Sequence, residues 1–345
     1  MLITFTPNPS LDKTVTIAGP LVPGQVHRIQ KETVHPGGKG INVGLGVARA
    51  GVPTLAVFPA NPDDVLLTLL DRGALPYLAT PREAPARMNL TIISAHSTTT
   101  KVNEPGARIS EDELQSLIER LLENVGSEDQ VMMCGVLAPG MPPDLYGSLV
   151  TQLRQKGAWV GVDAADETLM SLVAEFPAAA PNLLKPNAHE LGQVAGLDGD
   201  ELEFEAANGE LARVIHAAHD LRAEGVEEVL VSLGSAGAVL ACPEGTWYSP
   251  SPDVSVVSTV GAGDSLVAGY LIGKHQLLPP PRRLALAVAY GAAAVSMPGT
   301  SIPTPDQVAN FSSGTLPNPE RREELGTDQG KEERNQAQDD ERRKQ

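Results

Sequence analysis

The sequence contains little cysteine and no long apolar run. Its 345 residues include two cysteines, which are too few for a disulfide framework and lack the spacing of a metal site. We therefore predict a reducing compartment, the cytoplasm. No window approaches the roughly 20 apolar residues that a membrane span requires. The opening MLITFTPNPS also lacks the basic and apolar regions of an export signal, so we expect neither export nor a membrane partner.

Positive charge is also scarce. The chain has 43 acidic and 26 basic residues, which give a formal net charge of -17. Because binding to nucleic acid depends on clustered Lys and Arg, we expect no nucleic-acid partner. The sequence also lacks the G-x-x-x-x-G-K-[ST] pattern of a P-loop. A small anionic ligand remains compatible with this composition, since it needs only a few well-placed cations.

Short apolar runs alternate with helical patterns along most of the chain. This alternation predicts an α/β fold with a mostly parallel sheet flanked by helices. With 41% hydrophobic residues the chain can fill a sizeable core. The apolar runs are LITF, TLAVF, DQVMMC, AWVGVD, NLLKP and EEVLVSLG, and the periodic stretches between them include residues 110–124, 142–156 and 205–224.

Two segments interrupt the alternation. Residues 13–35 and 86–103 are rich in β-branched residues and have no helical pattern between their runs, so we predict a small separate β-sheet that acts as a lid. The α/β body then comprises residues 1–12, 36–85 and 104–311. Residues 312–345 contain Gly, Pro, Gln and charges of both signs without an apolar period, which predicts a disordered charged tail.

The stretch STVGAGDSLVAGYL, residues 258–271, joins an extended run to a helical pattern. The backbone N–H groups of Gly261, Ala262 and Gly263 can approach an anion at the amino end of the helix. Asp264 in the first turn is placed to take a proton from an alcohol that attacks a phosphoryl group. The alternative is a plain turn with an acidic helix start, worth about 1 kcal/mol or less. From this stretch alone both interpretations stay open.

A second glycine cluster, HPGGKGINVGLGVARAG, occupies residues 35–51. Its glycines permit a tight turn, Lys39 adds a cation, and a helix that begins near Asn42 adds a second positive helix end. The cluster also contains a G-x-G pattern, but its spacing and its place inside the helix argue against a dinucleotide site. The glycines of the turn are Gly37, Gly38 and Gly40.

Three polar residues lie in or near the predicted small sheet. Asp12 follows the first strand and a Pro-rich turn, where it can contact a polar ligand or form an Asx turn. Arg87 and Asn89, near the start of the second β-rich segment, can bind an anion and a hydroxyl group. As isolated residues, both would more often be solvated surface groups.

Two further stretches place polar groups at strand ends. In LLKPNAHEL, Asn187 and Glu190 have the spacing of a capping box. Their functional alternative is to face nucleotide phosphates and hold Mg²⁺ through water. In VLVSLGSAGAVL, a strand, a turn and a strand, Ser232 and Gly234 border a nucleotide or simply form a hairpin.

Together these stretches resemble the phosphofructokinase-B family of ribokinase-like sugar kinases, over about residues 1–311. PGGKGINVGLGVARAG looks like the first family signature and STVGAGDSLVAGYL like the second, with KPNAHEL and VSLGSAGA between them in the family order. The resemblance implies a Rossmann-like α/β body with a small β-sheet lid that closes on the sugar. It also implies a homodimer that forms through the lid.

The resemblance assigns roles to individual residues. It makes Asp264 the general base, with an anion hole at Gly261, Ala262 and Gly263, and it implies ATP and Mg²⁺ as cofactors. On the sugar phosphate it places Asp12, Gly38, Lys39, Asn42 and Arg87, and we add Arg28 and Asn89 to this set. On the ATP side it places Asn187, Glu190, Ser232 and Gly234, with Glu190 holding the metal through water, and we add Lys185.

The stretches TFTPNPSLDKTV, PGQVHR and GGKGINV look most like the branch of the family that phosphorylates sugar phosphates. Arg28, Lys39 and Arg87 are suitable donors for a phosphate already on the substrate. We expect fructose 1-phosphate, which gives fructose 1,6-bisphosphate, with fructose 6-phosphate and tagatose 6-phosphate as alternatives.

Departures from the family pattern bear on substrate choice. Residues 56–67 lack a Gly-rich segment, Val136 replaces a serine and His27 replaces an asparagine. One alternative function is a non-catalytic sugar-phosphate sensor, in which we would expect substitutions in the general base or the anion hole. A second alternative is a nicotinamide oxidoreductase, and the misplaced G-x-G pattern argues against it. Asp264, Gly261 and Gly263 are all intact, so the kinase is the better interpretation.

Overall fold

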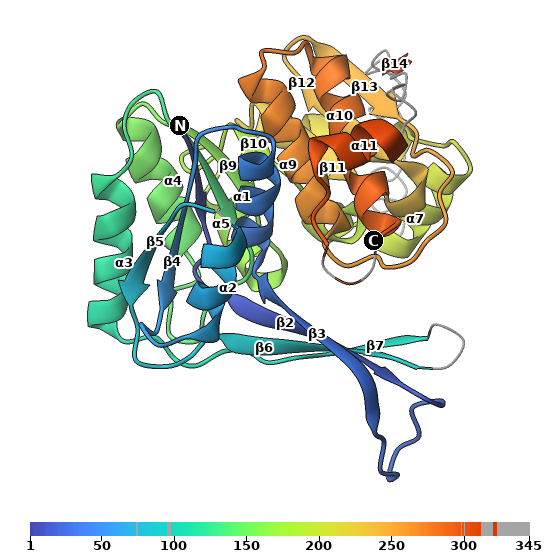
Figure 1. The fold of residues 1–345 in the computed structure, drawn as a ribbon. Helices are drawn as coiled ribbons and strands as arrows, with labels where there is room; N and C mark the ends of the chain where they lie inside the picture. Colours follow the sequence, from blue (N-terminus) through green and yellow to red (C-terminus); the bar gives the residue numbers. More distant parts are fainter. Residues whose placement is uncertain (74, 95–97, 298, 300, 312–319, 323–345) are drawn as a thin grey trace, which may run out of the picture.

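The computed structural model describes all residues except 74, 95–97, 298, 300, 312–319 and 323–345. An α/β body and a small sheet that projects from it form the described chain (Figure 1). The body is built on one sheet with the strand order β14-β13-β12-β11-β10-β9-β8-β1-β4-β5. Its strands are β1 (Leu2–Phe5), β4 (Thr54–Ala60), β5 (Tyr77–Pro81), β8 (Gln130–Cys134), β9 (Trp159–Asp163), β10 (Leu183–Leu184), β11 (Glu228–Ser232), β12 (Ala238–Cys242), β13 (Gly245–Ser249) and β14 (Glu320–Arg322).

In the large sheet, strands β5, β4, β1, β8, β9, β10 and β11 run parallel to one another. Strands β12, β13 and β14 continue this sheet with antiparallel pairing. Parallel strands need crossover connections, which place helices on both faces of the sheet. A strand buried on both faces is apolar along its length. This is why the runs LITF, TLAVF and QVMMC read as continuous apolar segments, and the predicted α/β class is confirmed.

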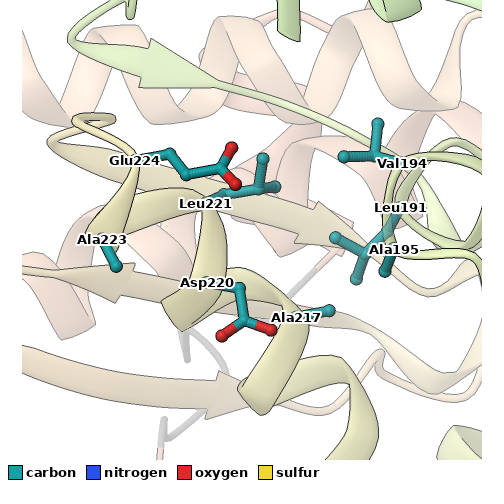
Figure 2. Close-up of a pocket in the computed structure, with 8 residues that line it drawn as sticks. All are labelled: Leu191, Val194, Ala195, Ala217, Asp220, Leu221, Ala223 and Glu224. Carbon is teal, nitrogen blue, oxygen red and sulfur yellow. The ribbon is translucent and has the colours of Figure 1, made fainter. Parts of the chain in front are cut away.

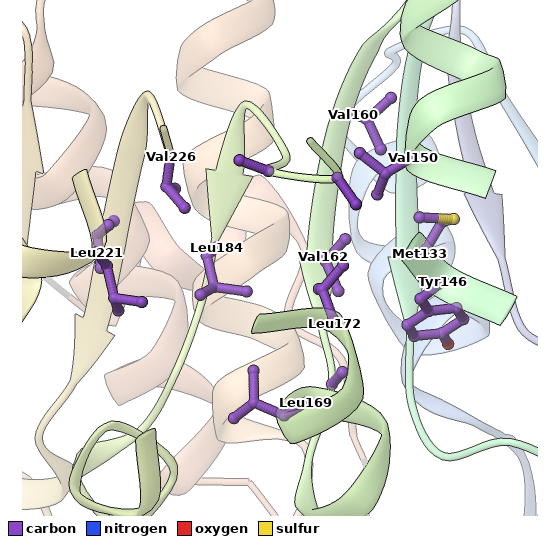
Figure 3. Close-up of a cluster of buried hydrophobic side chains, with 14 of the residues drawn as sticks. Met133, Tyr146, Val150, Val160, Val162, Leu169, Leu172, Leu184, Leu221 and Val226 are labelled. Atoms are coloured by element: carbon purple, nitrogen blue, oxygen red, sulfur yellow. The ribbon is translucent and has the colours of Figure 1, made fainter. Parts of the chain in front are cut away.

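Helices cover the two faces in separate groups. Along β8, Val131 and Met133 pack against one group, and Met132 and Cys134 pack toward the other. Figure 3 shows part of the first cluster, with Tyr146 of α4 against Met133. The first group is α3 (Glu111–Glu123), α4 (Leu145–Gln155), α5 (Asp166–Ala174), α6 (Ala188–Ala195), α7 (Gly199–Ala207) and α8 (Ala212–Ala223), and the second is α1 (Lys39–Arg49), α2 (Val65–Gly73), α9 (Ala262–His275) and α10 (Pro280–Val295), with α11 (Pro305–Phe311) packed beside α10.

The small sheet has the strand order β3-β2-β6-β7. It reaches slightly beyond the predicted segments, because β2 already begins at Ser10, opposite Gly37. Asp12 therefore lies inside a strand, paired with His35 and Asn89, and the predicted turn position is wrong. The bounds are β2 (Ser10–Ile17), β3 (Ile29–Gly37), β6 (Arg87–Ile93) and β7 (Thr99–Asn103).

Some element boundaries differ from the sequence prediction. The stretch 205–224 forms two helices, because the chain turns at Gly209, which has a φ of 84°. Helix α1 begins at Lys39, three residues before the predicted start near Asn42. The run that ends at Val260 forms no strand.

The predicted disordered tail needs one correction. Residues Glu320–Arg322 form strand β14 on the edge of the large sheet. Backbone pairing with β13 holds this strand, and its charged side chains give no sign of it in the sequence. The rest of the stretch 312–345 lies outside the described residues. Within the described part of the chain, no helix has both the length and the apolar character needed to cross a bilayer.

Candidate active site

A cavity of about 790 Å³ opens beside the carboxyl ends of the central parallel strands. Asp163 ends β9, Lys185 follows β10 and Ser232 ends β11. Ligands of open α/β sheets bind at this edge, because the ends of successive strands meet there. The lining includes Lys39, Lys101, Asp163, Lys185, Asn187, Ser232, Gly234, Val256, Gly261, Ala262, Gly263, Asp264, Val288 and Ala292.

Asp264 lies buried in the first turn of α9, at the wall of the cavity. Gly261 caps this helix with a φ of 79°, a left-handed conformation that favours glycine. The side chain of Asn42 on α1 donates a hydrogen bond of 2.8 Å to Asp264 Oδ2. Burial raises the pKa of Asp264 to about 6, and the nearby carboxylate of Asp163 acts in the same direction. The group is therefore ionised at neutral pH and has an affinity for a proton above that of an ordinary aspartate.

The first turn of α9 also offers free backbone donors. The N–H of Ser265 donates to the carbonyl of Gly261 at 2.9 Å, as the first hydrogen bond within the helix. Ala262 and Gly263 precede Ser265 in the first turn of α9, so their N–H groups have no acceptor within the helix. They border the same cavity as Asp264, so a base and a set of anion donors meet at one helix end.

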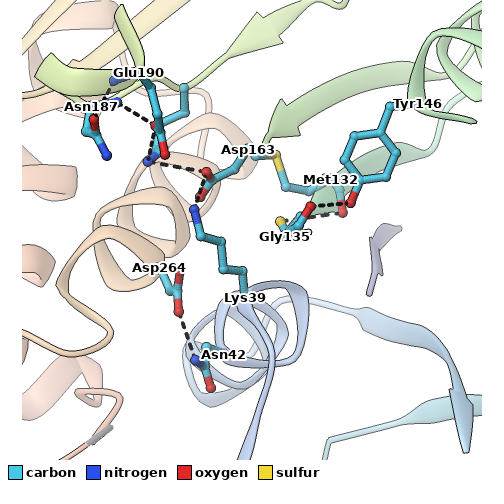
Figure 4. A network of polar contacts seen from close by, with 11 residues as sticks. Lys39, Asn42, Met132, Gly135, Tyr146, Asp163, Asn187, Glu190 and Asp264 are labelled. Carbon is cyan, nitrogen blue, oxygen red and sulfur yellow. Dashed lines mark hydrogen bonds and ion pairs between the residues drawn. The ribbon is translucent and has the colours of Figure 1, made fainter. Parts of the chain in front are cut away.

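A buried carboxylate, that of Asp163, contacts both lysines of the site, and Figure 4 shows it beside Lys39. Asp163 Oδ1 accepts a hydrogen bond from Lys39 Nζ at 2.8 Å and lies 3.3 Å from Lys185 Nζ. Burial alone raises the pKa of Asp163, but Lys185 and Lys39 lower it below the ordinary value. Burial opposes the charge of Lys39, yet Asp163 and the other nearby carboxylates raise the pKa of this lysine. Asp163 and Lys39 therefore both remain charged at neutral pH.

The position of Lys39 depends on the glycine before it. Gly38 caps α1 with a φ of 107°. A Cβ atom at this position would lie 2.8 Å from Cγ2 of Thr6, so the close approach of α1 to the end of β1 requires glycine. The turn thus presents Lys39 at the amino end of α1, beside Asp163.

The KPNAHEL stretch forms the capping box that its spacing predicts. Asn187 Oδ1 accepts from the N–H of Glu190 at 2.8 Å, and Glu190 Oε2 accepts from the N–H of Asn187 at 2.8 Å. Lys185 Nζ lies 3.9 Å from Glu190 Oε2, which links the box to Asp163. Ser232 forms a β-bridge with Asn187, and both line the cavity. The box thus connects Asn187 at the cavity wall to the buried carboxylate of Glu190 behind it.

A second polar group lies on the small sheet. Asp12 Oδ1 accepts hydrogen bonds from Asn89 Nδ2 at 3.0 Å and from the Ser10 hydroxyl at 2.9 Å. Arg87 is paired with Ser10 across the strands, and its Nη1 donates to the carbonyl of Glu104 at 2.9 Å. Its Nε is buried without a hydrogen-bond partner among the described residues. The group therefore combines hydroxyl-binding oxygen and amide atoms with a cation.

Comparison with known proteins decides the family. The model of the pfkB family carbohydrate kinases matches residues 6–307. The chain belongs to the pfkB family. A 1-phosphofructokinase of Haloferax volcanii is 32% identical over 89% of this chain and 95% of that protein, and a 1-phosphofructokinase of Bacillus subtilis is 30% identical over 85% and 92%. The crystal structure of phosphofructokinase-2 from Escherichia coli, in complex with substrates and products, has a TM-score of 0.80 and 27% identity, and covers 90% of this chain and 98% of that one.

Membership in the pfkB family confirms the predicted ribokinase-like fold and the enzyme class. This pfkB kinase is a phosphotransferase, which moves a phosphoryl group to an alcohol of a carbohydrate. The family thereby implies a nucleoside triphosphate as the phosphoryl donor.

The pfkB chain does not bring Arg28 to the cavity. Asp12 pairs with His35 and Ile17 pairs with Ile29, so Arg28 lies roughly 20 Å further along the hairpin than His35. Its side chain is exposed near the hairpin tip. The length of the hairpin, which spacing in the sequence does not show, separates Arg28 from Asp12 and Arg87.

Sequence reasoning also missed residues of this pfkB site. Asp163 was read as the end of an apolar strand, although a carboxylate at the carboxyl end of a parallel strand is a recognisable signal. Lys101 lines the cavity from the small sheet, and no motif marks it. Val288 and Ala292 of α10 form an apolar wall, and such residues cannot be told from core residues in a sequence.

A smaller hollow, of about 390 Å³, lies between α6 and α8 (Figure 2). Its described lining is mostly apolar, with the carboxylates of Asp220 and Glu224, and includes no cation. It shares no described residue with the larger cavity. The described lining of this hollow offers a phosphate no cation, so the larger cavity is the candidate active site of the kinase.

Proposed function

We propose that this kinase transfers the terminal phosphoryl group of ATP to fructose 1-phosphate and forms fructose 1,6-bisphosphate. The observation that carries the proposal is the buried Asp264, which shares one cavity with free helix N–H groups and with Lys39 and Lys185. The names of the curated relatives support the choice of acceptor. Fructose 6-phosphate and tagatose 6-phosphate are the alternative acceptors.

In the proposed reaction, Asp264 accepts the proton of the acceptor hydroxyl while the hydroxyl oxygen attacks the terminal phosphorus of ATP. The bond from that phosphorus to the oxygen shared with the β-phosphate breaks, and ADP leaves. Negative charge on the transferred group is stabilised by the N–H groups of Gly261, Ala262 and Gly263 at the positive end of α9. Asn42 keeps the base oriented through its hydrogen bond.

Lys185, Asn187, Ser232 and Gly234 are proposed to contact the nucleotide, and Glu190 to hold Mg²⁺ through water. The donor set fits this ion, because Asp163 Oδ2 is buried without a hydrogen-bond partner and Glu190 lies on the other side of Lys185. Within the described part of the chain, no cluster of three or more His, Cys, Asp or Glu side chains forms a complete metal site. Magnesium suits such a site, since it retains waters and takes phosphate oxygens. When bound, it neutralises phosphate charge.

The phosphate already on the sugar is proposed to bind beside Arg87, with Asp12 and Asn89 on sugar hydroxyls and with Gly38, Lys39 and Asn42 on the body side. Arg87→Ala should raise the KM for the sugar phosphate by about tenfold or more, the cost of one charged hydrogen bond, with a small effect on kcat. Steady-state kinetics test this, with the exposed Arg72→Ala as control. An unchanged KM would place the sugar phosphate elsewhere.

We further propose that the small sheet is a lid and that two copies pair through its outer face. Register and alternation place Leu11, Val15, Ile17, Leu90 and Val102 on one face, opposite the face that carries Asp12. Val15 and Ile17 are buried within one copy and Leu11 packs against the body, whereas Val102 is exposed and Leu90 is half-buried. Burial of Val102 and Leu90 against a second copy would favour association. In such a pair, Arg28 near the hairpin tip can approach the cavity of the partner copy.

Sedimentation velocity tests the pairing. The wild type should sediment as a dimer and Val102→Asp as a monomer. The side chain of Val102 is 54% exposed, and Val65 on α2 is a matched control at 55%. Val65→Asp should therefore remain a dimer. A monomeric wild type at micromolar concentration would reject the interface.

A coupled assay of ADP release tests the reaction itself. With ATP and Mg²⁺, kcat/KM should be highest for fructose 1-phosphate among four acceptors: fructose 1-phosphate, fructose 6-phosphate, tagatose 6-phosphate and fructose. A preference for a 6-phosphate would keep the mechanism and change the substrate. No turnover with any acceptor would favour a sugar-phosphate sensor.

A further inference from the structure

Lys101 is a cation of the cavity lining that has no role in the proposed reaction. It lies on β7 of the small sheet, and its side chain lines the cavity together with Lys39, Asp163 and Lys185 of the body. Among the described residues that line this cavity, it is the only one from the small sheet. The small sheet therefore reaches the nucleotide side of the site through Lys101.

The register of the small sheet fixes the face on which Lys101 lies. Lys101 pairs with Thr91, and Asn103 pairs with Asn89, which in turn pairs with Asp12. Because side chains alternate along a strand, Lys101 shares a face with Asn89 and Asp12 and stands two residues, roughly 7 Å, further from the body along the strand. That face is the one that meets the cavity.

The small sheet carries a second cation on this face, Arg87, at the end of β6 next to the body. Arg87 pairs with Ser10, and Lys101 pairs with Thr91, so the two cations are separated by roughly 13 Å along the strands. Lys101 lines the cavity that contains Asp264, and Arg87 does not. The two cations are therefore placed for two different phosphate groups.

The charges of the cavity show why Lys101 matters. Lys39 and Lys185 already share one carboxylate oxygen of Asp163, and Lys185 also faces Glu190. The lining also includes the carboxylates of Asp264, Glu203 and Asp253, so acidic groups outnumber the two lysines on the body side. The ammonium group of Lys101 makes no hydrogen bond or ion pair with the described residues, so it is free to take up an incoming anion.

We propose that Lys101 binds the terminal phosphoryl group of ATP from the small sheet, on the side opposite the anion hole of α9. The proposal rests on the proposed function, which makes the cavity a nucleotide site. No bond to Lys101 forms or breaks. Its charge offsets the negative charge of the group in transfer, a contribution that positioned cations make in phosphoryl transfer.

Nucleotide binding, measured by calorimetry on the full chain without acceptor, tests the proposal. Lys101→Met should weaken binding of AMP-PNP by about tenfold or more, the worth of one charged hydrogen bond, and should leave ADP binding within about twofold. Lys101→Arg should retain most of the AMP-PNP affinity. Lys13→Met is the matched control, because Lys13 lies on the opposite face of the same sheet and pairs with Glu32 at 2.7 Å.

Several other outcomes overturn the inference. An equal loss for both nucleotides, or no loss for either, removes the contact with the terminal phosphate. An effect confined to the sugar-phosphate KM assigns Lys101 to the acceptor instead. Failure of the wild type to bind AMP-PNP rejects the nucleotide site together with the proposal. A wild type that binds AMP-PNP but phosphorylates no ketohexose phosphate overturns the proposed reaction alone, since the binding test needs no acceptor.

Discussion

Asp264→Asn is expected to lower kcat by about 10²–10⁴-fold, the usual contribution of a positioned general base. An asparagine can still accept the hydrogen bond of Asn42, so the geometry of the helix start should be retained. ATP binding should change little, because the base acts on the acceptor hydroxyl. Coupled kinetics and calorimetry on the same preparation measure both quantities.

The pH dependence gives a second measure of the same group. Burial raises the pKa of Asp264 to about 6, and the base works only when ionised. The kcat/KM of the wild type should therefore fall about tenfold per pH unit below about 6 and level off above it. The residual activity of Asp264→Asn should lack this step.

Stability changes with pH in the opposite sense. Because the pKa of Asp264 is raised in the folded state, this state holds the proton more tightly than the unfolded chain does. The contribution of Asp264 to stability thus declines as pH rises through the window from about 4 to about 6. Asp264→Asn should accordingly show a higher Tm than the wild type at pH 7.

A control variant distinguishes a catalytic role of Asp264 from the general effect of an acidic residue at the start of a helix. Asp306 is an exposed acidic residue in the first turn of α11, away from the cavity. Asp306→Asn should leave kcat unchanged, since it removes only the interaction of a carboxylate with a helix end. Normal turnover in Asp264→Asn would exclude Asp264 from the mechanism.

Asp163→Asn is expected to destabilise the folded protein by about 3–5 kcal/mol, the cost of removing one partner from a buried ion pair. Asp163 is fully buried and faces both Lys39 and Lys185. Without the carboxylate, these two ammonium groups lie beside each other with less compensating charge. Urea denaturation, monitored by circular dichroism, gives the free energy of unfolding.

The effect on nucleotide binding follows from the same contacts. Asp163 holds Lys39 and Lys185 at 2.8 Å and 3.3 Å, so its removal should also raise the KM for ATP. Because the pKa of Asp163 is lowered in the folded state, its contribution to stability is present at neutral pH and is lost as pH falls below about 4.

An exposed pair serves as the comparison for Asp163. Asp129 bonds to the amino terminus at 2.8 Å near the surface. Surface pairs contribute about 1 kcal/mol or less, so Asp129→Asn should change the free energy of unfolding by no more than that. A similar small loss in Asp163→Asn would contradict the view that this carboxylate holds the two lysines.

Local patterns in the sequence predicted those parts of the site that are set by neighbouring residues. Gly38 lies in the glycine turn that the sequence indicates, although α1 begins at Lys39 and not near Asn42, and Asn187 and Glu190 form the capping box that their spacing predicts. Asp264 lies in the first turn of α9, as the glycines before it indicate. In each case the hydrogen bonds or backbone angles involve residues within a few positions of each other.

Contacts between distant residues were not predictable in this way. Asp163 meets Lys39 across 124 positions, and Asn42 meets Asp264 across 222. Lys101 reaches the cavity, and Arg28 lies away from it, because of strand register and hairpin length. Strand β14 depends on a free sheet edge that no side-chain pattern marks.

The sequence by itself determined the alternation of strands and helices, the two glycine turns and the kinase motifs, because these depend on local backbone and side-chain chemistry. The tertiary structure alone decided which charges meet. Asp163 ends a strand in the centre of the sheet, where parallel strands bring their carboxyl ends to one edge, and there it gathers two lysines from separate segments. Chain topology sets such encounters, and a linear pattern of residues does not contain them.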